Sequence, residues 1–313
     1  MIPVDNQMSK IKLSVVIVTY NRCKDLEESL NALFSLNESP SEIVVVDSHS
    51  TDDTHRLVKR YPLKFINIKE RSMVKARNIG FQHANGEVVA YVDDDAVVSK
   101  DWSKYILEPY ENEYVGGVAG RVLSYGDDKA LYIPAKHMAI GKVFNNGLVL
   151  GNFDIPTQHP IEVDTLIGCN MSFRRELLLK AGGFDENFRG SCFRDDTDMS
   201  LRLKRLNYKI IYNPKAIVWH KFKGKTVDNK WFYLTVYNHT YFYLKNFQPI
   251  TVRKILAFFF ATFFPPADYL KKTGIRIKPN PSSIAYVILG LISAILVYRK
   301  GDPSRIEKIL RIR

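Results

Sequence analysis

Short apolar runs alternate with amphipathic stretches along the first part of the chain. The runs at 13–19, 42–46 and 63–68 are rich in Val and Ile and are bounded by turn residues, which predicts strands that are covered on both faces. Helices are predicted between these strands. The first begins at Asp25 and has one apolar face, formed by Leu26, Leu30, Leu33 and Phe34. The second ends at Arg60, and the third covers 72–84. Strands that alternate with helices predict an α/β fold, in which helices lie on both faces of a mainly parallel sheet.

The alternation continues, with interruptions, as far as residue 220. A strand at 87–92 and a helix from Asp101 are followed by predicted strands at 115–123, 163–173, 209–212 and 216–219. A short helix at 175–181 is stopped by Gly182 and Gly183, and another helix opens at Asp195 with an apolar face that includes Met199, Leu203 and Leu206. Residues 125–162 show no sustained period, and no element is predicted there.

The composition changes after residue 222, which predicts a first domain at 1–222 and a helical region at 223–313 that is rich in aromatic and basic residues. Two uncharged runs, 255–267 and 282–298, lie in the second region, and Lys and Arg flank both of them. As a helix, the second run would reach roughly 25 Å, which is less than the ~30 Å of a hydrocarbon core. The pattern favours monotopic or interfacial attachment to an anionic membrane surface. A single span and buried helices of a soluble protein are the alternatives.

The charge is distributed unevenly along the chain. The whole chain has 45 Lys and Arg and 33 Asp and Glu. From Pro214 to Arg313 there are 18 Lys and Arg against 4 Asp and Glu, so residues 1–213 contain 27 Lys and Arg against 29 Asp and Glu. This basic region predicts an anionic partner, either a membrane or a nucleic acid. A nucleic-acid-binding module would not explain the uncharged runs, so no nucleic acid partner is expected. Three cysteines without CxxC spacing fit a reducing compartment, and the first ten residues lack the apolar region of a secretory signal.

Three consecutive carboxylates, Asp93, Asp94 and Asp95, follow the strand predicted at 87–92. Like charges at this spacing repel, so the cluster is either a solvated acidic turn or a site for a hard cation. Oxygen ligands suit Mg²⁺ or Mn²⁺, and open α/β sheets bind ligands at the carboxyl ends of their strands. The chain contains neither GxGxxG nor GxxxxGK[ST], which argues against dinucleotide-binding and P-loop enzymes.

The cluster belongs to a set of segments that occur in a characteristic order. They are residues 14–22, then 43–52, then 76–80 leading into 92–95, and finally 168–173 with 183–185 and 196–199. In order and spacing these segments resemble the inverting family 2 glycosyltransferases, and the resemblance extends over about residues 13–220. It implies a Rossmann-like GT-A fold for the domain at 1–222, and metal-dependent transfer of a sugar from a nucleotide-diphosphate donor.

The resemblance also implies a metal site at the acidic cluster. Asp93 and Asp95 would bind Mn²⁺ or Mg²⁺, and His220 would be a further metal or diphosphate contact. A divalent ion of this kind stabilises the negative charge that develops on the leaving diphosphate. A purely structural role is the alternative for His220.

Further residues are implied to bind the donor nucleotide. Asp47 would accept a hydrogen bond from the base, Asp94 would lie nearer the ribose, and Arg77 would lie toward the diphosphate. The residues that would lie near the base are Thr19, Tyr20 and Arg22. A mutual structural pair is the alternative for Asp47 and Arg77.

An inverting displacement needs a base that takes the proton of the acceptor hydroxyl. The family has an acidic motif, usually Glu-Asp, at the start of a helix; here it reads Asp195-Asp196, and Asp196 is implied as the catalytic base. The alternative is that these acids only complement the helix dipole.

The acceptor implied by the resemblance is a lipid-linked or envelope glycan at the cytoplasmic face of the cell membrane. A polyprenyl phosphate is the alternative acceptor, and it would barely need a base because it is already ionised. A sugar-nucleotide pyrophosphorylase of related fold is a further alternative. It would require a Gly-rich basic loop after the first strand, and Tyr20-Asn21-Arg22-Cys23 of this chain is not such a loop.

Overall fold

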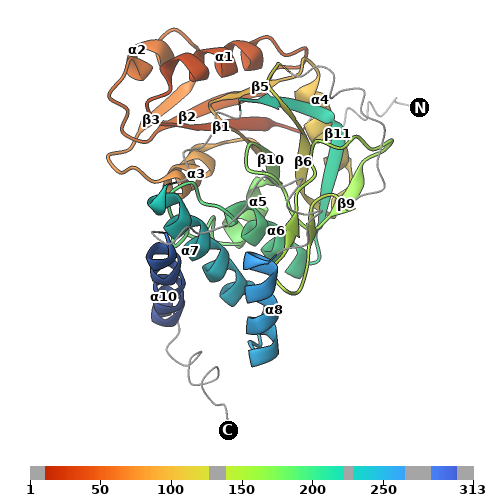
Figure 1. Cartoon of the computed structure of the whole chain (residues 1–313). Helices are drawn as coiled ribbons and strands as arrows, with labels where there is room; N and C mark the ends of the chain where they lie inside the picture. The colour runs from red at the N-terminus through yellow and green to blue at the C-terminus, as the bar shows by residue number, and fades with distance from the viewer. Residues whose placement is uncertain (1–10, 127–138, 222–227, 265–282, 302–313) are drawn as a thin grey trace, which may run out of the picture.

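The computed structural model describes residues 11–126, 139–221, 228–264 and 283–301. Their centre is a nine-stranded sheet in the order β3-β2-β1-β4-β10-β6-β11-β5, with β9 paired to β11 (Figure 1). The strands are β1 (Leu13–Thr19), β2 (Glu42–Asp47), β3 (Lys64–Asn67), β4 (Val88–Val92), β5 (Ala96–Val98), β6 (Val115–Ser124), β9 (Ile161–Val163), β10 (Asn170–Arg174) and β11 (Lys209–His220). A separate small ribbon pairs β7 (Lys142–Val143) with β8 (Val149–Leu150).

The predicted α/β class, with helices on both faces of the sheet, is confirmed. The helices are α1 (Cys23–Phe34), α2 (Thr54–Val58), α3 (Met73–His83), α4 (Trp102–Leu107), the 3-10 turn η1 (Glu108–Glu111), α5 (Arg175–Lys180), α6 (Asp195–Arg205), α7 (Asn229–Asn246), α8 (Val252–Phe263) and α10 (Ile284–Gly301). Strands β3, β2, β1 and β4 pair in parallel, while β10 runs antiparallel to both β4 and β6.

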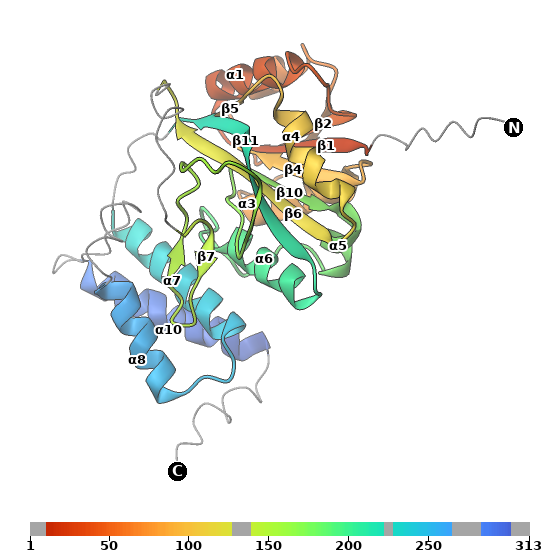
Figure 2. The same ribbon diagram turned by 90° about the vertical axis from the view of Figure 1, so that its right-hand side faces the viewer.

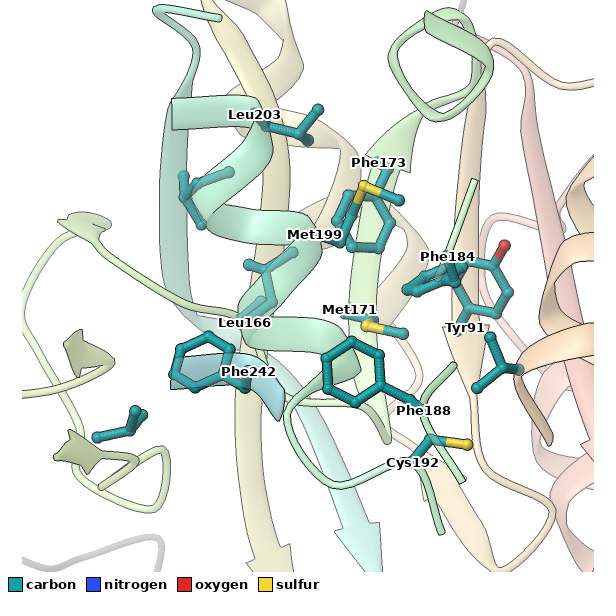
Figure 3. Packing of buried hydrophobic residues seen from close by; sticks show 14 of the residues in the cluster. Tyr91, Leu166, Met171, Phe173, Phe184, Phe188, Cys192, Met199, Leu203 and Phe242 are labelled. Carbon is teal, nitrogen blue, oxygen red and sulfur yellow. The ribbon is translucent and has the colours of Figure 1, made fainter. Parts of the chain in front are cut away.

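Side chains along the central strands alternate between two hydrophobic cores, as the period of a strand requires. Val16 belongs to the core beneath α3 and α6, whereas Val15 and Ile17 belong to the core beneath α1 and α4. Figure 3 shows part of the first core, where Met199 of α6 lies close to Phe173 of β10. Because both faces are covered, β1, β2 and β4 are mostly apolar, and most of their polar side chains lie where the strands begin or end.

Two strand predictions are wrong in detail, both because the strand pairings involve distant residues. The run at 163–173 is not one strand: β9 ends at Val163 and pairs with β11, whereas β10 begins at Asn170 and pairs with β4 and β6. The runs at 209–212 and 216–219 are a single strand, β11, whose register shifts between Asn213 and Ile217. A local irregularity of this kind accommodates Pro214 within a sheet.

Smaller differences concern side chains and one short strand. Phe34 and Leu206 were expected on buried helix faces but are 39% and 37% exposed, since each lies near a helix end where the core no longer reaches. Strand β5, which directly follows the acidic cluster, was not predicted from the sequence. It is only three residues long, and its antiparallel pairing with the end of β11 defines it.

Three helices of the C-terminal region gather at one end of the molecule, beyond α6 (Figures 1 and 2). Tyr237 and Phe242 of α7 are buried in the same core as the sheet. None of the helices in the described ranges is both long enough and apolar enough to cross a membrane. The division at residue 222 stays a prediction.

Candidate active site

The predicted site residues gather at the edge of the sheet where β1, β2 and β4 end. Strand β4 pairs in parallel with β1, and beyond these strands the Thr19 hydroxyl donates a hydrogen bond to Asp94 Oδ2 at 2.8 Å. Strand β11 runs antiparallel to β5, with His220 opposite Ala96, so the end of β11 returns to the acidic cluster. Strand pairing therefore assembles groups that are far apart in the sequence.

His220 lies against two of the three clustered carboxylates. Its Nε2 atom is 3.0 Å from Asp95 Oδ1 and 3.5 Å from Asp93 Oδ2. Burial lowers the pKa of His220, but hydrogen bonds and charges from Asp93 and Asp95 outweigh it and raise the pKa to about 9. Burial likewise opposes the charged form of Asp95, yet His220 and Arg22 hold its pKa below the usual range. The two carboxylates thus favour the protonated ring, whereas a metal ion would bind only the neutral ring.

Arg22 bridges Asp94 and Asp95, so Asp95 contacts both His220 and Arg22. Its Nη1 atom lies 3.0 Å from Asp94 Oδ1 and 2.5 Å from Asp95 Oδ2. Asp94 is 5% exposed, and burial raises its pKa to about 7 against the opposing charge of Arg22. One oxygen of Asp94 accepts from Thr19 and the other from Arg22. The predicted contact between Asp94 and the ribose stays a prediction.

The donor atoms at this edge fit a divalent cation. Asp93, Cys169 and His220 each have one potential ligand atom within 4.8 Å of the others, and Asp95 contacts the same histidine. Carboxylate oxygens suit Mn²⁺ or Mg²⁺. Burial raises the pKa of the Cys169 thiol well above its usual range, so the sulfur stays protonated and is a poor ligand for hard cations. The chemistry of the set therefore favours Asp93, Asp95 and His220 as ligands.

A second group of predicted residues lies at the ends of β1 and β2. Asp47 is fully buried and accepts hydrogen bonds from the backbone N–H of Ser50 and from the Asn67 side chain. The guanidinium of Arg71 lies 4.1 Å from the centre of the Tyr20 ring. The loop that carries Arg71 is tied to the end of β2, because Ser48 Oγ donates to Glu70 O and accepts from Ser72 N.

Arg77 lies between the acidic cluster and the start of α6. Its Nη1 atom is 2.6 Å from Asp195 Oδ2, and its Nη2 atom is 3.9 Å from Asp93 Oδ1. Although burial opposes it, the charges of Asp195 and Asp93 raise the pKa of Arg77 above its usual range, so this buried guanidinium stays charged. The partners of Arg77 are thus Asp195 and Asp93, and the alternative of a mutual pair with Asp47 is not realised.

Asp196 is half-buried and faces the turn that precedes β10. Its Oδ2 atom accepts from Gly168 N at 3.0 Å, and its Oδ1 atom accepts from Thr197 N at 2.6 Å. A Cβ atom at Gly168 would lie 2.9 Å from Arg77 Nη2 and 3.7 Å from Asp196 Oδ2. Because Gly168 has no side chain, the space between Arg77 and Asp196 stays open.

Helix α7 fixes the loop that leads into α6. The Asn238 side chain accepts from Arg189 N at 2.9 Å and donates to Arg189 O at 2.8 Å. Further along the loop, Arg194 has a φ of 82° and lies 3.4 Å from His239 of α7. Beyond the loop, Lys245 contacts Asp198 within the first turn of α6 at 2.9 Å. The C-terminal region is in this way connected directly to the acidic start of α6.

Several residues at this edge were not singled out from the sequence. Cys169 and Gly168 belong to a segment used for the resemblance, but only the pairing of β10 with β4 brings them beside Asp93. Arg71 carries no local signal other than its charge. In the sequence, Asn238 resembles an ordinary polar residue of an aromatic helix. In the structure it is completely buried within an 18-residue helix, which indicates a specific partner.

A family model described as Glycosyl transferase family 2 matches residues 14–182, which is more than half of the chain. The matched segment includes the carboxyl ends of β1, β2 and β4. It ends before α6 and β11, so Asp196 and His220 lie beyond it.

Curated relatives and solved structures are also similar to this chain. The glucosyl-dolichyl phosphate glucuronosyltransferase of Haloferax volcanii is 25% identical over 237 residues, which are 71% of this chain and 72% of the relative. The poly-beta-1,6-N-acetyl-D-glucosamine synthase of Staphylococcus epidermidis is 24% identical over 215 residues, 66% of this chain but only 49% of that protein. A mannosyltransferase structure from Pyrobaculum calidifontis, in complex with GDP-Man and Mn²⁺, has a TM-score of 0.58 at 20% identity and covers 96% of this chain and 86% of its own. At that identity the structural likeness shows the fold.

Proposed function

The chain belongs to glycosyl transferase family 2 and is a glycosyltransferase; we propose that it acts by inverting, metal-dependent transfer of a sugar from a nucleotide-diphosphate donor. One observation supports this most directly. Arg77 contacts both Asp93 and Asp195, while the neighbouring Asp196 contacts Gly168 next to Cys169. The proposed donor end and the proposed base are therefore adjacent within one site.

In this proposal Asp93, Asp95 and His220 hold Mn²⁺ or Mg²⁺. The ion supplies positive charge to the leaving diphosphate when it is bound. The protein contributes a second, permanent charge at Arg77, which its two carboxylate neighbours keep in position. Metal binding also requires His220 to lose the proton that Asp93 and Asp95 stabilise.

Asp196 is the proposed base for a hydroxyl acceptor. Its carboxylate takes the hydroxyl proton while the acceptor oxygen forms a bond to the anomeric carbon. The bond from that carbon to the diphosphate oxygen breaks on the opposite side, and its electron pair leaves with the diphosphate. The hydrogen bonds from Gly168 and Thr197 fix the orientation of the carboxylate, which favours a single direction of attack.

The nucleotide would occupy the ends of β1 and β2. Asp47 would accept from the base, and Thr19, Tyr20, Arg22 and Asp94 would line the path from base and ribose to the diphosphate. Tyr20 and Arg71 present a stacked ring and guanidinium beside the end of β2, and both groups can cover a planar base.

The proposed acceptor is a lipid-linked or envelope glycan at the cytoplasmic face of the cell membrane. The name of the Haloferax volcanii relative describes transfer onto a glucosyl-dolichyl phosphate, which is a lipid-linked sugar. The basic C-terminal region and its apolar helices support a location beside an anionic membrane.

A donor screen with purified full-length protein tests this function. Each nucleotide sugar is added with and without Mn²⁺, and thermal stabilisation and release of nucleotide diphosphate are measured. A preferred donor that stabilises the protein only with Mn²⁺ supports the proposal, and the anomeric configuration of the product tests inversion. Binding of no nucleotide sugar under either condition would contradict it.

A further inference from the structure

Helix α10 carries large apolar side chains on the face that it turns away from the protein. Ile288, Leu289, Ile292 and Leu296 are each between 48% and 51% exposed. The opposite stripe, which includes Val287 and Ala294, is buried. A helix of a soluble protein normally has charged side chains on its outer face, but α10 has none from Ile284 to Tyr298.

The buried stripe of α10 explains how this helix is held. At Gly290 a Cβ atom would lie 2.8 Å from the backbone oxygen of Tyr233 and 3.2 Å from the backbone nitrogen of Tyr237. The two helices therefore approach closely along α7, and Val287 joins Phe232 and Val236 in a small core. Because this packing uses only one stripe, the fold itself does not account for the apolar outer face.

Helix α8 repeats the arrangement. Phe258 is buried, and its ring stacks on Tyr243 of α7 with 4.2 Å between ring centres. Leu256 and Phe260 point the other way and are 53% and 58% exposed. Helices α8 and α10 lie on either side of α7 at the same end of the molecule (Figures 1 and 2).

The charges around these helices identify the occupant of the two outer faces. Arg253 and Lys254 lie at the start of α8, and in the sequence Arg299 and Lys300 directly follow the uncharged stretch 284–298. The 49 residues from Pro265 to Arg313 contain ten Lys and Arg against three Asp and Glu. A second copy of this chain would bring the same positive charges together, whereas an anionic bilayer offers both an apolar interior and opposite charge.

We propose that the outer faces of α8 and α10 form one lipid-contacting surface, by which the protein lies on an anionic bilayer without α8 or α10 crossing it. This surface is represented by Leu256, Phe260, Leu289 and Ile292. This surface specifies how the protein would contact the membrane proposed above. It rests on the proposed function only in the identity of the acceptor. Tyr233 and Tyr237 of α7 lie against Gly290 of α10, while Asn238 of α7 binds the loop at Arg189. A single helix therefore separates α10 from the loop that leads into α6, to which a lipid-linked acceptor would come.

Vesicle flotation with the full chain tests the proposal. Wild-type protein is mixed with vesicles of phosphatidylcholine alone or of phosphatidylcholine with phosphatidylglycerol. It is compared with the double variants Leu256→Glu/Phe260→Glu and Leu289→Glu/Ile292→Glu. The matched control is Leu179→Glu, because Leu179 is also 51% exposed but lies on α5. Thermal stability and donor binding are measured on each sample.

The expected result is binding of wild-type protein and control to the anionic vesicles, weakened by salt, with at least a tenfold lower partition for each double variant. Donor binding should be unchanged in all four proteins, which separates this proposal from the proposed function. Equal partition of the double variants and wild type would overturn it. The proposal would also be overturned if wild-type protein bound no vesicles. This includes the case of a wild-type dimer that the Glu substitutions dissociate, and the case of a wild-type monomer that they unfold.

Discussion

Arg77 Nη1 and Asp195 Oδ2 are 2.6 Å apart, in a buried ion pair that joins α3 to the first turn of α6. This pair distinguishes two neighbouring acids that look equivalent in the sequence. Asp195 is 3% exposed and is engaged by Arg77, whereas Asp196 is only half-buried and faces the turn at Gly168. This difference supports Asp196 as the proposed base, whereas Asp195 holds the guanidinium beside Asp93.

Asp196→Asn should lower kcat by at least a hundredfold with a hydroxyl acceptor, because the amide cannot take the proton. Donor affinity should change little, since no nucleotide contact is proposed for this residue. Single-turnover transfer and donor binding by calorimetry measure the two effects. An unchanged kcat would remove the assignment, and it would point to an ionised acceptor such as a polyprenyl phosphate.

Arg77→Gln should destabilise the fold by about 3–5 kcal/mol, because it leaves the buried Asp195 without its partner. Asp195→Asn added to that variant should recover part of the loss, since no buried charge then remains unpaired. Urea unfolding of the two single variants and the double variant gives the coupling free energy. Additive effects of the two substitutions would mean that the pair has no energetic coupling.

Asp95→Ala should weaken Mn²⁺ binding at least tenfold and abolish the stimulation of transfer by metal. The carboxylate is proposed as a direct ligand, and its loss also removes a partner of His220. Mn²⁺ titration followed by electron paramagnetic resonance measures the affinity independently of activity. Asp101→Ala, an exposed acid outside the site, serves as control. Wild-type Mn²⁺ affinity in the Asp95 variant would contradict the ligand role.

His239 should make a destabilising contribution below pH 6.5, opposite in sign to that of Asp94, whose raised pKa favours the folded state as the pH falls below 7. Burial, reinforced by the charge of Arg194, lowers the pKa of His239 well below its usual value, so the folded protein keeps the ring neutral. The unfolded chain binds a proton as the pH falls through ~6.5, which favours unfolding by up to about 1.4 kcal/mol per pH unit. Urea unfolding at pH 7.5 and 5.5 tests this contribution: from the higher to the lower pH, the free energy of unfolding of His239→Phe should change in a more stabilising direction than that of wild type. Equal changes in the two proteins would remove His239 as a contributor.

Asn238→Ala should reduce transfer through a loss of positioning. The substitution removes both hydrogen bonds from the Asn238 side chain to Arg189; Arg189 O still accepts from Cys192 N, but Arg189 N–H loses this acceptor, at a cost of about 1–3 kcal/mol. The loop before α6 would lose its fixed position, so kcat should fall while donor affinity stays the same. Lys230→Ala, an exposed change on the same helix, is the control. Wild-type kcat in the Asn238 variant would show that the loop is positioned without this contact.

The amino-acid sequence determined the features that depend on local pattern. Apolar runs such as Leu13–Thr19 predicted buried strands, because a side-chain period of two leaves few polar positions when both faces are covered. Turn residues at the strand ends located Asp47 and the acidic cluster at one edge of the sheet. The order of these segments was sufficient for the family, which the match over residues 14–182 confirms.

Only the tertiary structure decided which of these residues meet. The pairing of Arg77 with Asp195 and the approach of Cys169 to Asp93 join residues that are distant in the chain, so no local period records them. The same reason explains the two misjudged strands, whose limits are set by their partners. It also explains α8 and α10: the sequence predicts apolar helices, but packing on α7 determines which of their faces stays exposed. Hydrophobic periodicity specifies what is buried, whereas the partner of each buried group depends on the whole fold.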